Sequence, residues 1–226
     1  MTKTTPLHSK TTVFLIDDHP LVRDWLSRLI NEETDLEVCG WATKADEAIG
    51  EIGRLKPGII IVDIGLPGKS GLELIRHLTD QNPEELILVL SMHDEAVYAH
   101  RALKAGARGY VSKRETTEKM VPAIRRVLAG GMSISETWAE ALDAGSSRHK
   151  NPALAGDVSM LSDREFEVFR LLASGRETSE IAQELGVSLK TVQSFCARIK
   201  EKLNLRNATE LLQAATRWAD AVAGAG

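Results

Sequence analysis

Five side chains that could bind a metal ion or a phosphoryl group stand at the ends of short apolar runs. Asp17 and Asp18 follow one run, Asp63 ends another, and Ser91 and Lys113 follow two later ones. If these runs are strands of one parallel sheet, their carboxyl ends share an edge, and the five side chains gather there. An aspartate is a competent nucleophile toward phosphorus, and a neighbouring lysine and hydroxyl can bind phosphoryl oxygens. The pattern therefore predicts a site that forms an acyl phosphate on Asp63.

Three carboxylates at one edge of a sheet require a compensating cation. They repel one another at neutral pH, and a hard divalent ion that keeps several waters and needs few protein ligands relieves this repulsion. We therefore expect Mg²⁺ as the cofactor. Each residue alone has a plainer explanation, since an aspartate after a strand often caps the next helix, and Asp18 precedes His19 and Pro20. The combination is more specific than any single member.

The apolar runs alternate with helical patterns over about the first 130 residues. The runs cover 13–16, 36–41, 59–62, 86–90 and 109–111. Four of them are apolar almost throughout, which is typical of parallel strands covered on both faces. Five strand–helix units with short connections predict a doubly wound α/β domain, flavodoxin-like, with a five-stranded parallel sheet and a ligand crevice at its carboxyl edge.

A second, smaller domain is predicted beyond this sheet. The chain of 226 residues is long enough for two cores. Residues 144–156 are small and polar with scattered Gly, Ser and Pro, which indicates a flexible linker. From 161 to 218 the pattern is helical throughout, and Ser162 and Glu165 form a capping box at its start. We expect an N-terminal tail at 1–11, the α/β domain at 12–130, a linker helix and flexible linker at 131–156, and an all-α domain at 157–226.

The composition excludes several classes of protein. Apolar residues make up 43% and charged residues 27%, as in ordinary globular proteins. Cys39 and Cys196 are far apart and lack metal-binding spacing, so both are predicted to be core residues. The N-terminus is polar, unlike a signal peptide, and no apolar run approaches the ~20 residues of a membrane span. We expect a cytoplasmic protein without a membrane partner.

The C-terminal region carries a helix-turn-helix pattern. A short helix over 179–185 is ended by Gly186, and Ser188 caps the next helix, whose apolar face is Val192, Cys196, Ile199 and Leu203. Residues 187–206 hold five basic side chains against one acidic, a balance of +4 in a chain whose net charge is −4. A basic helix face is often only solvated surface, but this one lies where DNA phosphates would bind. The predicted contacts to double-stranded DNA are Lys190, Thr191, Gln193, Ser194, Ala197, Arg198 and Lys202.

The motifs of both regions resemble those of response regulators of the NarL/FixJ type. In the first region these are Asp17-Asp18-His19-Pro20, the stretch from Asp63 to Gly71, Ser91 to Asp94, and Gly106 to Lys113. The second region is similar to LuxR-type domains in Leu161 to Glu165, Leu172 to Gly175, Glu180 to Ala182, Leu185 to Ser188, Lys190 to Val192 and Lys202-Leu203. The sequence departs from the LuxR-type pattern at Glu177, at Phe195, and in the base-reading positions Gln193, Ser194 and Ala197.

The resemblance implies roles for individual residues. Asp63 would accept the phosphoryl group from a histidine kinase, with Lys113 beside it. Asp18, Asp63 and the Gly65 carbonyl would bind Mg²⁺ directly, and Asp17 would act through a water. Ser91 and Tyr110 would form the switch pair that moves on phosphorylation. The chain would then be a DNA-binding regulator rather than an enzyme, with no chemistry beyond the gain and loss of its own phosphate, and a homodimer when phosphorylated.

Two alternatives from other classes remain at this point. A phosphohydrolase of the haloacid-dehalogenase type also uses an aspartate nucleophile with Mg²⁺, but it needs an acid two residues downstream, where this chain has Gly65. A degenerate regulator would bind DNA or protein without phosphorylation. The complete set of site residues disfavours that alternative, while the few base-reading side chains favour it.

Overall fold

The computed structural model describes residues 10–92, 95–135 and 156–223. By their contacts, the described residues 10–92 and 102–133 form one compact unit, and the described residues 95–101, 134–135 and 156–223 form a second. Most of the predicted linker, 131–156, lies outside the described residues, and so does most of the predicted tail. No helix among the described residues is long and apolar enough to cross a membrane.

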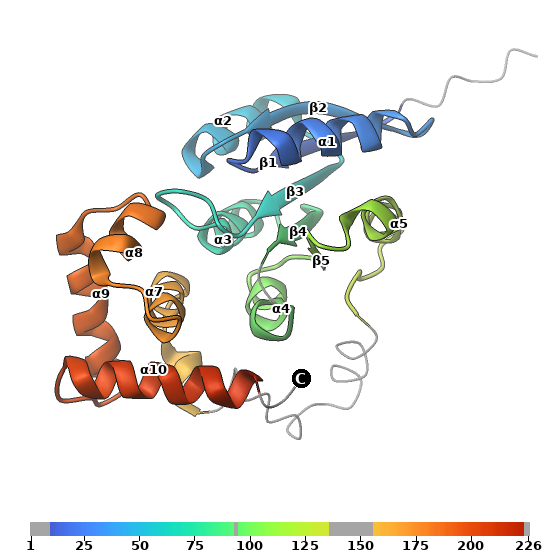
Figure 1. The fold of residues 1–226 in the computed structure, drawn as a ribbon. Helices are drawn as coiled ribbons and strands as arrows, with labels where there is room; N and C mark the ends of the chain where they lie inside the picture. Colours follow the sequence, from blue (N-terminus) through green and yellow to red (C-terminus); the bar gives the residue numbers. More distant parts are fainter. Residues whose placement is uncertain (1–9, 93–94, 136–155, 224–226) are drawn as a thin grey trace, which may run out of the picture. The chain divides into compact units, whose positions relative to one another are not determined.

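The first unit is built on a five-stranded sheet of order β2-β1-β3-β4-β5, with every neighbouring pair parallel (Figure 1). This confirms the predicted doubly wound fold. The last four residues of β1 and all residues of β3 and β4 are buried, because apolar side chains on both faces of these strands are covered. The strands are β1 (Thr11–Ile16), β2 (Leu36–Ala42), β3 (Ile59–Asp63), β4 (Ile87–Ser91) and β5 (Gly109–Ser112).

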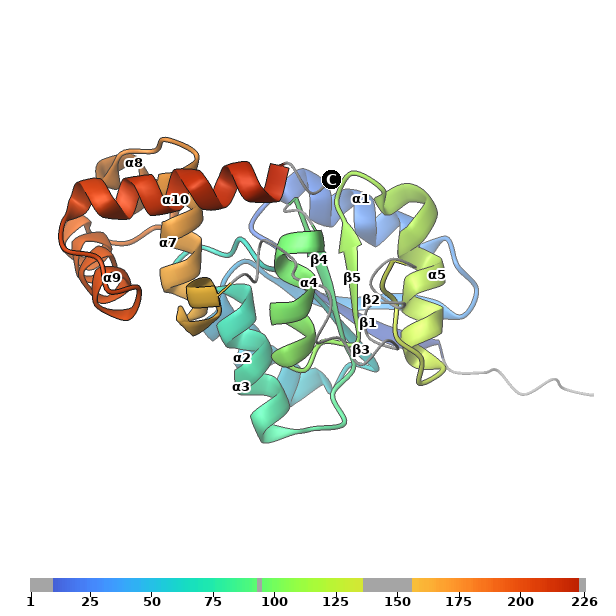
Figure 2. The same cartoon turned by 90° about the horizontal axis from the view of Figure 1, so that it is seen from below.

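Helices cover both faces of this sheet (Figure 2). On one face, Leu26 and Ile30 of α1 and Met120 and Ile124 of α5 share a core cluster with β1, β3, β4 and β5. The opposite face carries α2 and α3, as Figure 2 shows. The helices are α1 (Pro20–Asn31), α2 (Ala45–Leu55), α3 (Gly71–Gln81) and α5 (Thr116–Leu128), and α4 (Glu95–Lys104) is divided between the two units after residue 101.

The second unit contains a short helical bundle after a 3-10 turn, η2 (Gly156–Met160). Its helices are α7 (Asp163–Ala173), α8 (Thr178–Glu184), α9 (Leu189–Lys202) and α10 (Ala208–Ala223). Trp218 of α10 packs edge-on against Phe166 and Phe169 of α7, which joins the first and last helices. The capping box is confirmed, since Ser162 accepts from the N–H of Glu165 and the Glu165 carboxylate accepts from the N–H of Ser162.

Candidate functional site

The loop from β1 to α1 is folded around the Asp17 carboxylate. Asp17 is 2% exposed, and its Oδ1 accepts a 2.8 Å hydrogen bond from the main-chain N–H of His19. Pro20 then opens α1, because its fixed φ suits the first helical turn and it needs no donor there. The acidic loop is thus set by a local turn and a proline, and it directs Asp17 and Asp18 toward the end of β3.

A second device holds the same loop in place. The Arg23 guanidinium of α1 donates a 2.8 Å hydrogen bond to the main-chain oxygen of Asp17. It also lies 4.5 Å from the centre of the Trp41 ring, at the end of β2. A stacked guanidinium keeps its donors in fixed directions, so Arg23 links the loop to the neighbouring strand.

Asp63 is the last residue of β3 and is 4% exposed. The main-chain N–H of Gly65 donates to its Oδ1 over 3.1 Å. Gly71 begins α3 directly against this strand end: a Cβ at that position would lie 2.1 Å from the carbonyl oxygen of Asp63. Only glycine allows this approach, which brings the start of α3 against the strand end that carries Asp63.

Lys113 joins the two buried carboxylates. It follows β5, and its main-chain N–H donates a hydrogen bond to the Ser91 carbonyl oxygen, which fixes the loop at the sheet edge. Its ammonium lies 2.6 Å from Asp17 Oδ2 and 2.6 Å from Asp63 Oδ2, and all three side chains are 5% exposed or less. The predicted gathering of Asp17, Asp63 and Lys113 at the carboxyl edge is therefore present.

The burial of this site changes the ionisation of its groups. Burial raises the pKa of Asp63, and the Asp17 carboxylate raises it further, while Lys113 opposes both. Burial alone would lower the pKa of Lys113, but the Asp63 and Asp17 carboxylates raise it overall. A lysine held in its charged form beside a carboxylate nucleophile is suited to binding an anionic phosphoryl group.

Asp18 and His19 complete a set of groups that fits a divalent cation. Ligand atoms of Asp17, Asp18, His19 and Asp63 all lie within 4.8 Å of one another. Asp18 Oδ1 is buried and accepts no hydrogen bond, whereas Asp17 Oδ2 has the Lys113 ammonium beside it. Buried carboxylate oxygens in this state are costly unless a cation is present, so the donor set fits the expected Mg²⁺. Sequence reasoning missed His19 as a member of this group, although it directly follows the acidic pair.

The remaining residues predicted for the receiver site lie around this group. Ser91 ends β4 and is fully buried, opposite Ser112 in the β4–β5 register. Tyr110 is in β5 and is 4% exposed. A Cβ built on Gly65 would lie 3.8 Å from both carboxylate oxygens of Asp63, and nothing else would contact it. That side of Asp63 is left open by the lack of a side chain at Gly65.

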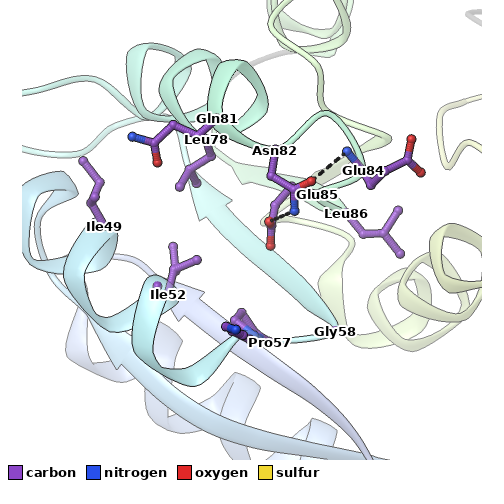
Figure 3. Close-up of a pocket in the computed structure, with 12 residues that line it drawn as sticks. Ile49, Ile52, Pro57, Gly58, Leu78, Gln81, Asn82, Glu84, Glu85 and Leu86 are labelled. Atoms are coloured by element: carbon purple, nitrogen blue, oxygen red, sulfur yellow. Dashed lines mark hydrogen bonds between the residues drawn. The ribbon is translucent and has the colours of Figure 1, made fainter.

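A hollow of about 560 Å³ lies elsewhere on this unit, between α2 and α3 (Figure 3). Its wall includes Ile52 and Leu78, and its rim includes Gly58 and Leu86, which precede β3 and β4. These positions mark the amino ends of the strands, whereas Asp63 and Ser91 mark the carboxyl ends. None of the predicted site residues lines this hollow.

Helix α9 presents most of the predicted DNA contacts on its surface. Val192 and Ile199 are buried, and α9 packs against α7 and α8, which leaves the other face of the helix outward. Lys190, Gln193, Ala197 and Arg198 are exposed, as expected for residues that would meet DNA. The Ser194 hydroxyl is also exposed but donates to the Lys190 carbonyl of its own helix, and the Thr191 hydroxyl bonds that of Ser188.

Lys202 at the end of α9 has a partner inside the domain. Its ammonium lies 2.6 Å from Oε2 of Glu165, the same oxygen that caps the start of α7. Burial raises the pKa of Glu165, but the hydrogen bonds from Lys202 and Ser162 outweigh this and lower it overall. Sequence reasoning assigned Lys202 only to DNA and missed this ion pair, because nothing in the spacing of 37 residues indicates it.

Comparison with known proteins identifies both units. The family described as "Response regulator receiver domain" matches residues 13–125, and "Bacterial regulatory proteins, luxR family" matches residues 159–215. The chain is 35% identical to the transcriptional activator protein ExaE of Pseudomonas putida, covering 90% of this chain and 94% of that one. It is 34% identical to the oxygen regulatory protein NreC of Staphylococcus aureus, covering 91% and 96%.

Solved structures agree with this. A LuxR-family two-component response regulator from Aurantimonas is 34% identical, with a TM-score of 0.56 over 61% of this chain and 98% of its own. RcsB of Salmonella enterica, bound to promoter P1flhDC in the presence of the phosphomimetic BeF3⁻, is 26% identical, with a TM-score of 0.60 over 92% of this chain and all of its own. The chain belongs to the two-component response regulators that join a receiver domain to a LuxR-type DNA-binding domain.

Proposed function

We propose that this regulator is switched by phosphorylation of Asp63 and that the switch controls the DNA binding of α9. The observation that carries the proposal is the buried Asp63 carboxylate 2.6 Å from the Lys113 ammonium, beside Asp17. The relatives are transcriptional regulators, which agrees with this role. The family is one of DNA-binding regulators rather than enzymes, so the only chemistry proposed is the gain and loss of the Asp63 phosphate.

The phosphoryl group would come from a phosphohistidine of a histidine kinase. An Asp63 oxygen attacks phosphorus, so that one O–P bond forms while the N–P bond to the kinase imidazole breaks and its electron pair returns to that nitrogen. Lys113 offsets the negative charge that collects on the phosphoryl oxygens, and Ser91 bonds one of them. Tyr110 then moves with Ser91 as the switch pair.

The metal that supports this step would be held by the carboxyl edge of the sheet. Asp18, Asp63 and the Gly65 carbonyl would be direct ligands of Mg²⁺, with Asp17 acting through a water. Bound there, the ion supplies positive charge to the transferred group. The buried Asp18 Oδ1, which accepts no hydrogen bond, supports this placement.

The output would be the binding of a phosphorylated homodimer to two half-sites of double-stranded DNA. Lys190, Arg198 and Lys202 would contact phosphates, with Thr191, Ser194 and Ala197 on the same surface. Gln193 would be the main base reader and would favour adenine. Solved neighbours include RcsB as two dimers bound to two parallel DNAs, and this supports the assembly.

Labelling with acetyl phosphate and Mg²⁺ tests the nucleophile. Wild-type protein and Asp80→Asn should gain acid-labile phosphate, whereas Asp63→Asn should gain none. Asp80 is a matched control because it is an exposed aspartate of α3. Labelling of Asp63→Asn at the wild-type level would overturn the assignment. Full labelling with no change in DNA binding would instead favour a regulator that works without phosphorylation.

A further inference from the structure

His19 lies over the carboxylates at the carboxyl edge of the sheet. Its Nδ1 makes a 3.1 Å hydrogen bond with Asp17 Oδ1, and it lies 2.9 Å from Asp18 Oδ1 and 3.9 Å from Asp63 Oδ2. The contact with Asp18 lacks the geometry of a hydrogen bond, and that oxygen accepts none from any other group. The imidazole therefore lies close to Asp18 and Asp63, and no hydrogen bond explains its short distance from Asp18.

These spacings are those of ligands around one octahedral ion. With metal–ligand bonds of about 2.1 Å, neighbouring ligand atoms lie about 3.0 Å apart and opposite ones about 4.2 Å apart. The 2.9 Å distance from His19 Nδ1 to Asp18 Oδ1, which no hydrogen bond explains, matches the first value. The 3.9 Å distance to Asp63 falls between the two values. One ion could therefore contact the imidazole nitrogen together with the carboxylates.

The position of His19 also suits a ligand that joins from the rim. Its side chain is 60% exposed, whereas those of Asp17 and Asp63 are 3% and 5% exposed. Lys113 contacts the Oδ2 atoms of the two buried carboxylates, and its side chain is only 5% exposed. An ion would therefore enter on the solvent side, where His19 stands.

The chemistry of the imidazole nitrogen decides which ions bind more tightly when His19 is a ligand. Mg²⁺ is a hard ion that prefers oxygen, so an imidazole adds little to its affinity. Imidazole suits borderline transition ions such as Ni²⁺, Zn²⁺ and Fe²⁺, which also bind mixed N/O sites more tightly along the first-row series. A site with three carboxylates and one imidazole is therefore no longer selective for Mg²⁺.

We propose that His19 is a metal ligand through Nδ1, and that it makes the phosphorylation site of this regulator bind borderline divalent transition ions more tightly than Mg²⁺. The inference rests on the metal site given under the proposed function. It adds a residue and an ion class to that site. Occupancy of the site would then depend on transition-metal supply as well as on Mg²⁺.

Calorimetric titration of the tag-free full-length protein with Ni²⁺ alone and with Mg²⁺ alone tests this. His19→Asn should weaken Ni²⁺ binding about 10-fold or more, while Mg²⁺ affinity changes less than about 3-fold. Asparagine is chosen because it caps a helix well and keeps the start of α1. His77→Ala is the matched control, since it removes a histidine of α3 that bonds Gln81 and takes no part in the site.

A second variant and a competition experiment show whether both ions bind at the acidic site. Asp18→Asn should weaken both ions, and Mg²⁺ should compete with Ni²⁺, which places both at the acidic site. Four results would each overturn the proposal. His19→Asn could weaken the binding of Ni²⁺ and Mg²⁺ equally, leave both affinities unchanged, or tighten the binding of either ion. The fourth is a wild-type protein that does not bind Ni²⁺ more tightly than Mg²⁺. Labelling of wild-type and Asp63→Asn protein with Mg²⁺ tests the proposed function separately, because that reaction does not require His19 as a ligand.

Discussion

The proposed chemistry of this regulator depends on a few charged side chains whose burial costs folding free energy. Asp63 is buried beside Asp17, and these surroundings raise its pKa even though Lys113 is within 2.6 Å. An ionised Asp63 therefore makes the metal-free folded protein less stable than a neutral group in its place would. The same charge is what allows the site to bind a cation and a phosphoryl group.

Asp63→Asn should stabilise the metal-free protein at neutral pH. A carboxyl group whose pKa is raised on folding lowers stability as the pH rises from its unfolded value, near 3.8, through its folded value. The advantage of the variant should thus be absent below about pH 4 and should grow as the pH rises toward 7. Urea unfolding of both proteins at pH 3.5–7.5 in EDTA measures it. Added Mg²⁺ should remove the difference, and a constant difference at every pH would contradict the explanation.

The lifetime of the phosphate should depend on residue 65. A side chain there would start 3.8 Å from both Asp63 oxygens and would screen the phosphoryl group from water. Gly65→Asn should therefore slow the loss of phosphate several-fold, measured by phosphate-affinity gels after removal of the donor. Gly50→Asn, in open space on α2, serves as the control. An unchanged or faster loss in Gly65→Asn would show that water reaches Asp63 by another side.

At the scale of elements, single contacts fix helices to their neighbours. Arg23 links the β1–α1 loop to Trp41 at the end of β2, and Lys202 links the end of α9 to the start of α7. The second contact joins the candidate DNA-reading helix to the helix that supports it. Lys202 is thus predicted to affect stability as well as DNA binding.

Lys202→Met should destabilise the DNA-binding domain by about 1–2 kcal/mol, because the Glu165 carboxylate would lose its charged partner. The pKa of Glu165 is lowered in the folded protein, so this stabilisation is present at neutral pH and is lost as the pH falls through that folded value. Thermal unfolding of wild type, Lys202→Met and Lys190→Met measures it. Lys190 is exposed at the other end of α9, so its loss should weaken DNA binding alone. Equal stability of the two variants would mean that the ion pair contributes nothing.

At the scale of the whole molecule, the two units must communicate through phosphorylation. A single DNA-binding domain with few base-reading side chains gains discrimination from a second half-site. Dimer formation raises the effective concentration of the second recognition helix, so avidity can grow ~100-fold without a new contact. The solved neighbour RcsB is an example, since two RcsB dimers have been seen bound to two parallel DNAs.

Residues 157–226 alone should therefore bind DNA weakly and without response to a phosphodonor, whereas the phosphorylated full-length protein binds tightly. Fluorescence anisotropy on one target at fixed salt compares the fragment with full-length protein in both states. Equal affinity of phosphorylated and unphosphorylated full-length protein would contradict the coupling.

Gln193→Ala should relax base preference at one position in each half-site at a cost of about 1–3 kcal/mol, while Lys190→Ala should weaken binding to all sequences alike.

The sequence by itself determined the architecture. Apolar runs of three to six residues separated by helical spacing define a parallel sheet, because strands buried on both faces cannot alternate polar and apolar side chains. The capping box at Ser162 and the cap at Ser188 were equally evident, since these signals are local. The positions of Asp17, Asp63 and Lys113 at one edge followed from strand direction alone.

Only the tertiary structure decided which atoms meet. That His19 faces Asp17, Asp18 and Asp63 depends on the turn from β1 into α1. The pairs Arg23–Trp41 and Glu165–Lys202 join residues 18 and 37 positions apart, and no periodicity relates them. A strand or helix pattern reports which face of an element is buried. The partner of a given charged atom is set instead by how the elements pack, and that information is spread over the whole domain.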